Sequence, residues 1–371
     1  MTRLHDLYDQ QGQSPWLDNL RRAWVRDGDL AEWVSRGVRG VTSNPSIFQK
    51  AIAGSADYDE QFAAGLARGD SIEEIYWDLV VTDIEGALAV LRPVYDASDG
   101  LDGYVSVEVA PDLAHDTEGT VAAARELHSR IDEPNLYVKI PGTAEGLPAI
   151  RRTIAHGGSV NVTLLFSLDR YAEVIEAHQA GLEELVASGA SPERVGRVSS
   201  VASFFVSRVD SEVDRRLDAI GGDQAASLKG RAAVANAQRA YALFRERYAG
   251  PRWEALAAAG ARVQRPLWAS TSTKDPAYPD TLYVDTLIGP DTVNTLPDAT
   301  LDAFLDHGTV ARTVDADLDD ASAVLDRLAD VGIDLDDVTA LLEKEGVAAF
   351  TASYDDLLDT LAAKARELGG S

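Results

Sequence analysis

Short runs of β-branched and aromatic residues alternate along the chain with longer stretches in which apolar residues recur every three or four positions. Short apolar runs are typical of buried β-strands, and a three- to four-residue spacing is typical of amphipathic helices. No repeat of fixed sequence period accompanies this alternation. The short runs predict eight strands, at residues 15–17, 38–42, 104–109, 136–140, 159–164, 198–205, 266–270 and 292–295.

The longer stretches carry helix start signals. Ser71 and Glu74 have the spacing of a capping box, and the apolar positions after them continue toward Val94. Ser191 precedes a proline, which suits an N-cap residue followed by the first helical position. Further helices are predicted at residues 169–187 and 223–248, which keep the helical spacing.

Eight strands that alternate with helices predict a closed (β/α)8 barrel, the TIM barrel, with additional helices. A doubly wound open sheet is the alternative, but such sheets usually carry a Gly-rich phosphate turn after the first strand when they bind nucleotides. Neither a G-x-G-x-x-G nor a Walker A motif occurs, which favours the barrel.

The last part of the chain, from about residue 298, is acidic and has a helical pattern, and it decides how many domains we expect. The 371 residues are enough for two ordinary domains or one large one, but no linker rich in Pro, Gly or Ser precedes this part. We therefore expect a single domain over residues 1–371. Its barrel core lies at about 15–297, and C-terminal helices at about 298–371 pack on it as a helical appendix.

Composition and charge narrow the range of partners. The chain has 34 basic and 61 acidic residues, a net charge of −27. Such a field repels phosphate backbones and anionic lipids, so neither a nucleic acid nor a membrane is expected as a partner. An anionic small substrate would need a local cluster of positive charge. No run of about 18 apolar residues and no secretory signal occurs, so we expect a cytoplasmic protein.

Candidate chemistry is sought at the carboxyl ends of the strands, where TIM barrels place their catalytic groups. Lys139 stands inside an apolar strand, where an uncompensated ammonium costs several kcal/mol. The chain has only six lysines against 28 arginines, so a lysine at this position calls for a property that arginine lacks. An amine can lose its proton and attack a carbonyl, whereas a guanidinium cannot. The alternative is a lysine that pairs with a carboxylate or extends to solvent at the strand edge.

Two carboxylates are candidates for proton transfer. Asp18 follows the first strand and reads equally as a helix N-cap. Glu108 interrupts a strand of valines, and its structural alternative is a buried ion pair with Lys139 on the neighbouring strand. Both interpretations of Glu108 place the two side chains close together. The chain has no cysteine, its six histidines show no metal-binding spacing and no G-x-S-x-G motif occurs, so a metal site and a serine nucleophile are not expected.

Several segments, taken in order, resemble the transaldolases. They are residues 16–18, 40–46, 105–108, 138–143, 161–167 and 203–208, with the region of Asn294. The resemblance covers residues 15 to about 297 and, with the chain length, is closest to the longer bacterial subgroup. It implies a metal-independent transferase of the pentose phosphate pathway that needs no cofactor. Such an enzyme moves a dihydroxyacetone unit from fructose 6-phosphate or sedoheptulose 7-phosphate to erythrose 4-phosphate or glyceraldehyde 3-phosphate.

The resemblance also implies a role for each matching residue. Lys139 matches the Schiff-base lysine, Asp18 the general acid/base at the C4 hydroxyl, and Glu108 with Thr163 a water-mediated proton relay. Asn44, Asn161 and Ser203 match residues that hold the hydroxyl groups of the dihydroxyacetone unit. Arg208 matches a phosphate-binding arginine.

One segment departs from the family pattern. Many relatives carry a second phosphate-binding arginine in an Ala-Ser-Phe-Arg-like segment, where this chain reads Ala-Ser-Thr-Ser-Thr-Lys over residues 269–274. Either Lys274 supplies the missing charge or hydroxyls such as that of Ser270 bind the phosphate. A lyase of the fructose-6-phosphate aldolase type and a non-catalytic sugar-phosphate binder are the alternative functions. Glu108 favours transfer, because the aldolases tend to carry glutamine there. A homodimer and a monomer are both left open.

Overall fold

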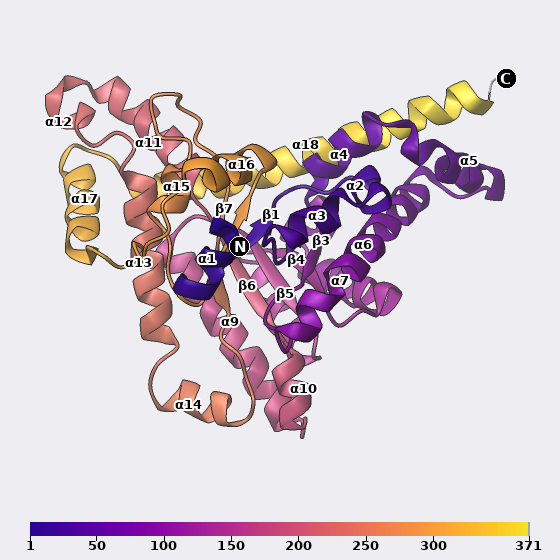
Figure 1. Cartoon of the computed structure of the whole chain (residues 1–371), viewed down its shortest axis with the longest axis horizontal. Coiled ribbons are helices and arrows are strands. Elements are labelled where there is room, and N and C mark those ends of the chain that lie inside the picture. The colour runs from indigo at the N-terminus through magenta and orange to yellow at the C-terminus, as the bar shows by residue number, and fades with distance from the viewer. Residues whose placement is uncertain (370–371) are drawn as a thin grey trace.

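The computed structural model describes residues 1–369 and has a closed barrel of eight parallel strands at its centre (Figure 1). Each strand pairs with the next along the chain, and β1 pairs with β8 over the whole length of both strands. The predicted barrel is thereby confirmed against the open sheet. The strands are β1 (Gln13–Leu17), β2 (Val41–Thr42), β3 (Val105–Glu108), β4 (Leu136–Pro141), β5 (Val160–Leu165), β6 (Ser200–Phe205), β7 (Arg265–Ala269) and β8 (Thr292–Leu296).

Every residue of the eight strands is buried. Parallel strands covered on both faces read as continuous apolar runs, which is why the short runs of the sequence located all eight to within three residues at either end. The shortest strand, β2, follows Gly40, where a Cβ atom would lie 2.5 Å from the ring of Trp16. Only glycine therefore allows β1 and the start of β2 to approach so closely.

Helices surround the barrel and extend beyond it (Figure 1). The first half of the chain contributes α1 (Arg3–Gln11), α2 (Arg22–Asp27), α3 (Asp29–Ser35), α4 (Pro45–Ala53), α5 (Asp59–Arg68), α6 (Ile72–Ala97), α7 (Thr117–Ile131), α8 (Gly146–Ala155) and α9 (Leu168–Ala187), with 3₁₀ turns η1 (Ala56–Tyr58) and η2 (Pro111–His115). The second half contributes α10 (Pro192–Arg197), α11 (Ser207–Ile220), α12 (Gly222–Ala226), α13 (Ala232–Arg247), α14 (Pro251–Ala258), α15 (Leu282–Asp285), α16 (Asp298–His307), α17 (Leu318–Asp330) and α18 (Leu335–Gly369).

Three of the predicted helix starts and stretches are confirmed. The capping box before α6 has both of its hydrogen bonds, since the Glu74 N–H donates to Ser71 Oγ and the Ser71 N–H to the Glu74 carboxylate. The helix continues past Val94 to Ala97. Ser191 caps α10 as expected, and the stretch 169–187 is helical as α9.

The single helix predicted at residues 223–248 is wrong, because two helices, α12 and α13, occupy it. Gly230, between them, has a φ of 69°, which ends the helical path. Two carboxylates of α11 then bind the chain before it resumes. Asp214 accepts from the Gly230 N–H at 3.0 Å, and Asp210 accepts from the Ala233 N–H at 2.8 Å. These tertiary hydrogen bonds outweigh the local helical spacing.

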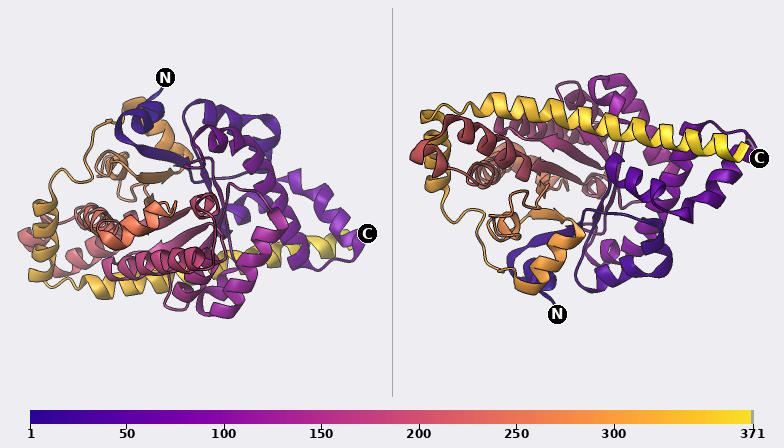
Figure 2. Two further views of the ribbon diagram at one scale, coloured as in Figure 1. Left: turned by 90° about the horizontal axis from the view of Figure 1, so that it is seen from below. Right: turned by 90° about the horizontal axis from the view of Figure 1, so that it is seen from above.

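The C-terminal helix α18 is the longest element, with 35 residues, and crosses the molecule as one continuous ribbon in the right-hand view of Figure 2. It rests on α4, where Ser353 and Ser46 share a hydrogen bond of 2.7 Å. At its middle, Gly346 lies against Leu164 of β5. The predicted appendix thus passes over the carboxyl ends of the barrel strands. No helix within residues 1–369 combines the length and apolar character needed to cross a bilayer.

A buried ion-pair network closes the amino-terminal end of the barrel. Asp102, just before β3, is 0% exposed and accepts hydrogen bonds from Ser14, Trp16, Arg39 and Arg265 at 2.7–3.2 Å. Burial alone would raise the pKa of Asp102, but the two guanidinium groups outweigh it and hold the pKa below its ordinary value. This carboxylate is therefore fully compensated within the fold.

Candidate active site

A buried lysine and glutamate face each other at the carboxyl end of the barrel. Lys139 of β4 stands directly opposite Glu108 of β3 in the strand register. The Lys139 Nζ lies 3.3 Å from the Glu108 Oε2 and donates to the Ser43 carbonyl at 3.1 Å. The lysine is 5% exposed and the glutamate 6%. The predicted proximity of the two side chains is confirmed.

Asp18 follows β1 and points toward the same region. Its Oδ1 accepts a hydrogen bond of 2.8 Å from Thr42 Oγ1, at the end of β2. Thr42 is in turn bonded to Thr295 of β8 at 2.6 Å. The N-cap of the next helix, α2, is Arg21, so Asp18 is not a helix cap. Its carboxyl is held by the mouth of the barrel instead.

The two carboxyl groups have unusual electrostatic surroundings. Burial raises the pKa of Asp18 above its ordinary value, although Thr42 and Lys139 partly oppose the shift. Burial likewise raises the pKa of Glu108 despite the adjacent ammonium group of Lys139. The Glu108 Oε2 has the ammonium group of Lys139 beside it at 3.3 Å, and within residues 1–369 the buried hydroxyl of Thr163 on β5 has no hydrogen-bond partner. Buried carboxyl groups with raised pKa values are candidates for proton transfer.

A row of amide and hydroxyl groups lies beside Lys139. Asn161 of β5 is opposite Lys139 in the strand register. Its Nδ2 donates to Ser106 Oγ at 3.1 Å, and its Oδ1 accepts from Ser203 Oγ of β6 at 2.7 Å. The side chain of Asn161 is therefore fixed by neighbours on both sides.

Asn44 lies on the opposite side of the barrel mouth. Its Oδ1 caps α4 by accepting from the Ile47 N–H at 3.0 Å. Because the cap uses the oxygen, the amide N–H groups of Asn44 stay free to donate to a ligand.

The basic residues predicted to bind phosphate come from two elements. Arg208, in the first turn of α11, lies over the ring of Phe205 with its guanidinium carbon 5.0 Å from the ring centroid. Ser270 follows β7 and is bonded to Ser207 Oγ at 2.9 Å. Lys274 donates to Ser272 Oγ at 2.8 Å. The arginine is oriented by stacking, whereas the lysine is placed by a loop.

One cavity of about 130 Å³ collects most of these groups. The predicted residues that line it are Asp18, Asn44, Lys139, Thr163, Ser203, Arg208, Ser270 and Lys274. Glu108 and Asn161 do not line the cavity but contact lining residues from behind. Asn294 is buried on β8, where its Nδ2 faces the Tyr283 carbonyl at 3.4 Å, and it does not line the cavity.

Comparison with known proteins identifies one family over nearly the whole chain. The family model described as transaldolase/fructose-6-phosphate aldolase matches residues 15–361. The chain belongs to this family. It is 54% identical over 352 residues to a transaldolase of Parafrankia sp. (strain EAN1pec), with 94% of this chain and 95% of the relative covered. It is 53% identical to transaldolases of Frankia alni and Thermobifida fusca, with 97% and 95% of this chain and 96% and 95% of the relatives covered.

Sequence reasoning missed several residues that line the cavity of this transaldolase-family chain. Thr42, which donates to Asp18, and Thr295 come from strands whose ends were considered, but threonine is common in strands and gave no signal. Phe350 comes from the middle of α18 and also lines the cavity. Nothing in the local sequence of an amphipathic C-terminal helix indicates that one of its aromatic rings lines the same cavity as Lys139, more than 200 residues earlier in the chain.

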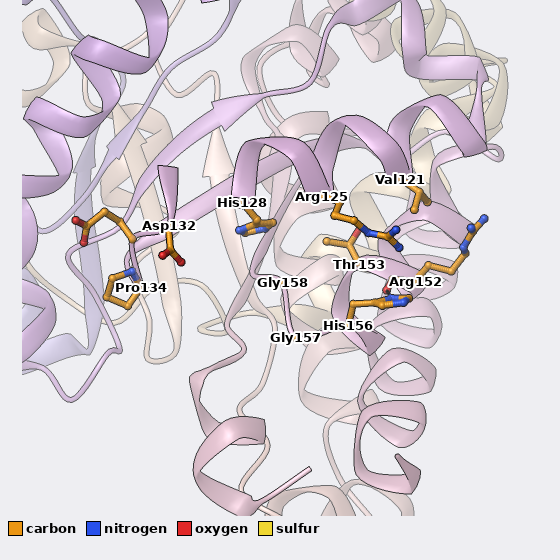
Figure 3. A pocket seen from close by; sticks show the side chains of 11 residues that line it. Val121, Arg125, His128, Asp132, Pro134, Arg152, Thr153, His156, Gly157 and Gly158 are labelled. Carbon is orange, nitrogen blue, oxygen red and sulfur yellow. Dashed lines mark hydrogen bonds between the residues drawn. The ribbon is translucent and has the colours of Figure 1, made fainter. Parts of the chain in front are cut away.

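A second cavity, of about 400 Å³, lies at the other end of the barrel and is drawn in Figure 3. Its basic side chains, Arg125, His128, Arg152 and His156, gather near the C-terminal ends of α7 and α8. The guanidinium groups there offset the negative ends of the helix dipoles, whereas burial lowers the pKa of His128 and disfavours its charged form. None of the residues that match the transaldolase pattern lines this cavity. Within residues 1–369 no group of three or more His, Cys, Asp or Glu side chains is arranged to hold a metal ion.

Proposed function

We propose that this chain is a transaldolase that moves a dihydroxyacetone unit between sugar phosphates through an imine at Lys139. The observation that carries the proposal is the pairing of buried Lys139 with Glu108 at the wall of a cavity that also holds Asp18. A lone amine in a buried strand suits attack on a ketone carbonyl, because the partner carboxylate can take its proton. The identity of about 53–54% to transaldolases over most of both chains supports the same function.

The first step forms the imine. The amine of Lys139 attacks C2 of a ketose phosphate, the C2 oxygen leaves as water, and a C=N bond to the lysine replaces the carbonyl. We assign the required proton transfers to Glu108, whose pKa is raised by burial, with Thr163 at the wall of the cavity. Ser203 and Asn44 are assigned to bind the two hydroxyl groups of the dihydroxyacetone portion, with Asn161 fixing the position of Ser203.

The second step breaks the C3–C4 bond. Asp18 removes the proton from the C4 hydroxyl, the C4 oxygen becomes an aldehyde carbonyl, and the bonding electrons pass to C3 and on into the imine as an enamine. The aldose phosphate leaves, and an acceptor aldehyde takes its place. Attack of C3 on that aldehyde returns the proton from Asp18 to the new hydroxyl. Hydrolysis of the imine then frees Lys139.

The alternative within the family is an aldolase that protonates the enamine and releases free dihydroxyacetone. Two features favour transfer. The carboxylate of Glu108 pairs with the lysine, and Phe350 of α18 adds an aromatic ring to the lining of a cavity of only about 130 Å³. A small, partly apolar cavity disfavours water as the group that collects the enamine.

A coupled assay of the purified protein separates the two functions. With fructose 6-phosphate and erythrose 4-phosphate, we expect steady formation of glyceraldehyde 3-phosphate and sedoheptulose 7-phosphate. With fructose 6-phosphate alone, we expect no more than one turnover per protein chain, because the enamine waits for an aldehyde. Continued release of free dihydroxyacetone without an acceptor would identify an aldolase, and no product in either case would refute both functions.

A further inference from the structure

Five basic side chains line one cavity of about 710 Å³ outside the reaction chamber. Arg21 and Arg22 pair with Asp298 and Asp83. The other three come from separate elements and are Lys50 of α4, Arg208 of α11 and Lys274 after β7. Asp18 and Asn44 line this outer cavity as well as the inner one at Lys139. The outer cavity therefore continues the inner one toward solvent, and a chain-like ligand held at Lys139 extends into it.

The positive charge of these three residues is only partly compensated. Within residues 1–369 none of them forms an ion pair, although Asp18 and Glu345 attract Arg208, and Asp18 attracts Lys274, from beyond ion-pair distance. Two of the three carboxylates that line the outer cavity pair with other arginines, Asp57 with Arg26 and Asp298 with Arg21. The third, Asp18, accepts from the neutral hydroxyl of Thr42. In a chain of net charge −27, three unpaired cations around one cavity are conspicuous.

The three cations also repel one another. Burial lowers the pKa of Lys274, Arg208 lowers it further and Lys50 adds to the effect, with only Asp18 opposing them. Like charges that line one cavity repel each other, and an anion between them reduces that repulsion. A dianion in the cavity would remove the repulsion and stabilise all three side chains.

We propose that Lys50 is a third cation for the phosphate group of the substrate, acting with Arg208 and Lys274 at the junction of the two cavities. This inference rests on the proposed function for the identity of the substrate, a sugar phosphate. Arg208 and Lys274 line both cavities, whereas Lys50 lines only the outer one. Lys50 thus meets the phosphate oxygens that face outward, while the other two hold those nearer the reacting carbons.

The division of roles follows from the side chains. A stacked guanidinium gives a directional contact to phosphate, whereas an exposed ammonium acts as a point charge that salt screens. Lys50 is exposed in the last turn of α4, so its contribution should be modest and salt-dependent. Lys50 also helps to replace the second phosphate-binding arginine that this chain lacks, because Lys50 and Lys274 together supply positive charge to the phosphate.

The test uses inorganic phosphate as the probe and the intact protein, with binding measured by calorimetry at low salt. Lys50→Gln should weaken phosphate binding by about 3- to 10-fold, and Lys50→Glu by more. Lys50→Arg should restore most of the affinity. Lys344→Gln is the matched control, since it removes one exposed positive charge from a helix but lines neither cavity. It should change phosphate binding by less than about 2-fold, and unchanged binding in Lys50→Gln and Lys50→Glu would overturn the proposal.

Steady-state kinetics give a second readout that a purely structural role would not produce. Lys50→Gln should raise the KM for phosphorylated donors while imine formation with unphosphorylated dihydroxyacetone stays unchanged. An equal loss with both substrates would assign Lys50 to folding of α4 and reject the phosphate contact. Because phosphate binding needs no turnover, a protein that binds phosphate through Lys50 but has no transfer activity would refute the proposed function alone.

Discussion

Buried carboxylates have opposite electrostatic surroundings at the two ends of the barrel. At the amino-terminal end, Asp102 accepts four hydrogen bonds, two of them from guanidinium groups, and its pKa is lowered. At the carboxyl end, Glu108 faces the single ammonium group of Lys139 at 3.3 Å, and the pKa values of Glu108 and Asp18 are raised. The same fold contains both environments, separated by little more than the length of a strand.

We propose that this difference separates charges that stabilise the fold from charges that perform chemistry. A carboxylate surrounded by donors stays ionised and gives up its proton-accepting capacity. A carboxylate whose burial is only partly compensated costs stability, but its raised pKa suits proton transfer. Substitutions at the two ends should therefore have different effects. Those at Asp102 should lower stability, and those at Asp18 and Glu108 should lower activity.

The largest effect is expected from Asp18→Asn. The amide cannot accept the proton of the C4 hydroxyl, so kcat should fall by about 10²- to 10⁴-fold. The Asn side chain keeps the hydrogen bond from Thr42, so the melting temperature should stay close to that of the wild type. Rates with saturating fructose 6-phosphate and erythrose 4-phosphate, together with a thermal melt, measure both. A large fall in melting temperature with retained activity would reverse the comparison between the two ends.

Asp102→Asn should show the opposite pattern. It leaves Arg265, which is 4% exposed, without its counter-charge, and breaking a buried pair in this way costs about 3–5 kcal/mol. At a temperature low enough to keep the variant folded, its activity per folded molecule should match that of the wild type. Because the folded pKa of Asp102 lies below 3.8, its stabilisation is complete above that pH and is lost only as the pH falls through the folded value. Denaturant unfolding at pH 7 measures the loss in the free energy of unfolding.

The matched control for Asp102 is Asp27→Asn, which removes an exposed partner of Arg26. It should leave the free energy of unfolding essentially unchanged, because exposed pairs contribute little. Similar penalties for Asp102→Asn and Asp27→Asn would show that the amino-terminal network is not a stabilising centre.

Arg208→Ala should have the next largest effect, on substrate binding. Loss of one charge-assisted contact costs about 1.5–3 kcal/mol, so the KM for phosphorylated donors should rise by roughly 10- to 150-fold. Imine formation with unphosphorylated dihydroxyacetone should change much less. Lys274→Ala should act in the same direction but more weakly, since the hydroxyl of Ser272 remains beside it. A stronger effect of Lys274→Ala would make the loop after β7 the main phosphate anchor.

Much of this account could be predicted from the sequence because consecutive strands of a parallel barrel are neighbours. That rule alone places Glu108 beside Lys139 once each is assigned to its strand. The break at Gly230 and the place of Phe350 could not be predicted, because both depend on contacts with distant parts of the chain. Thr42 was missed for a different reason, since a strand threonine is ordinary until its hydroxyl is seen on Asp18.

The smallest effect is expected on the stability of Glu108→Gln. The folded pKa of Glu108 is raised above 4.5, so ionisation destabilises the folded wild type as the pH rises from 4.5 through the folded value. Glutamine carries no such cost. The variant should therefore be as stable as the wild type at pH 4.5 and no less stable at pH 8, while its activity falls. A clear loss of stability at pH 8 alone would assign the Glu108–Lys139 pair to the fold.

The central claim is that Lys139 is the nucleophile, and borohydride trapping tests it most directly. Reduction in the presence of fructose 6-phosphate should attach one three-carbon adduct per chain, and peptide mass spectrometry should locate it on Lys139. Lys139→Ala should take up none, while Lys344→Gln should be labelled like the wild type. An adduct on any other lysine, or full transfer activity in Lys139→Ala, would contradict the account.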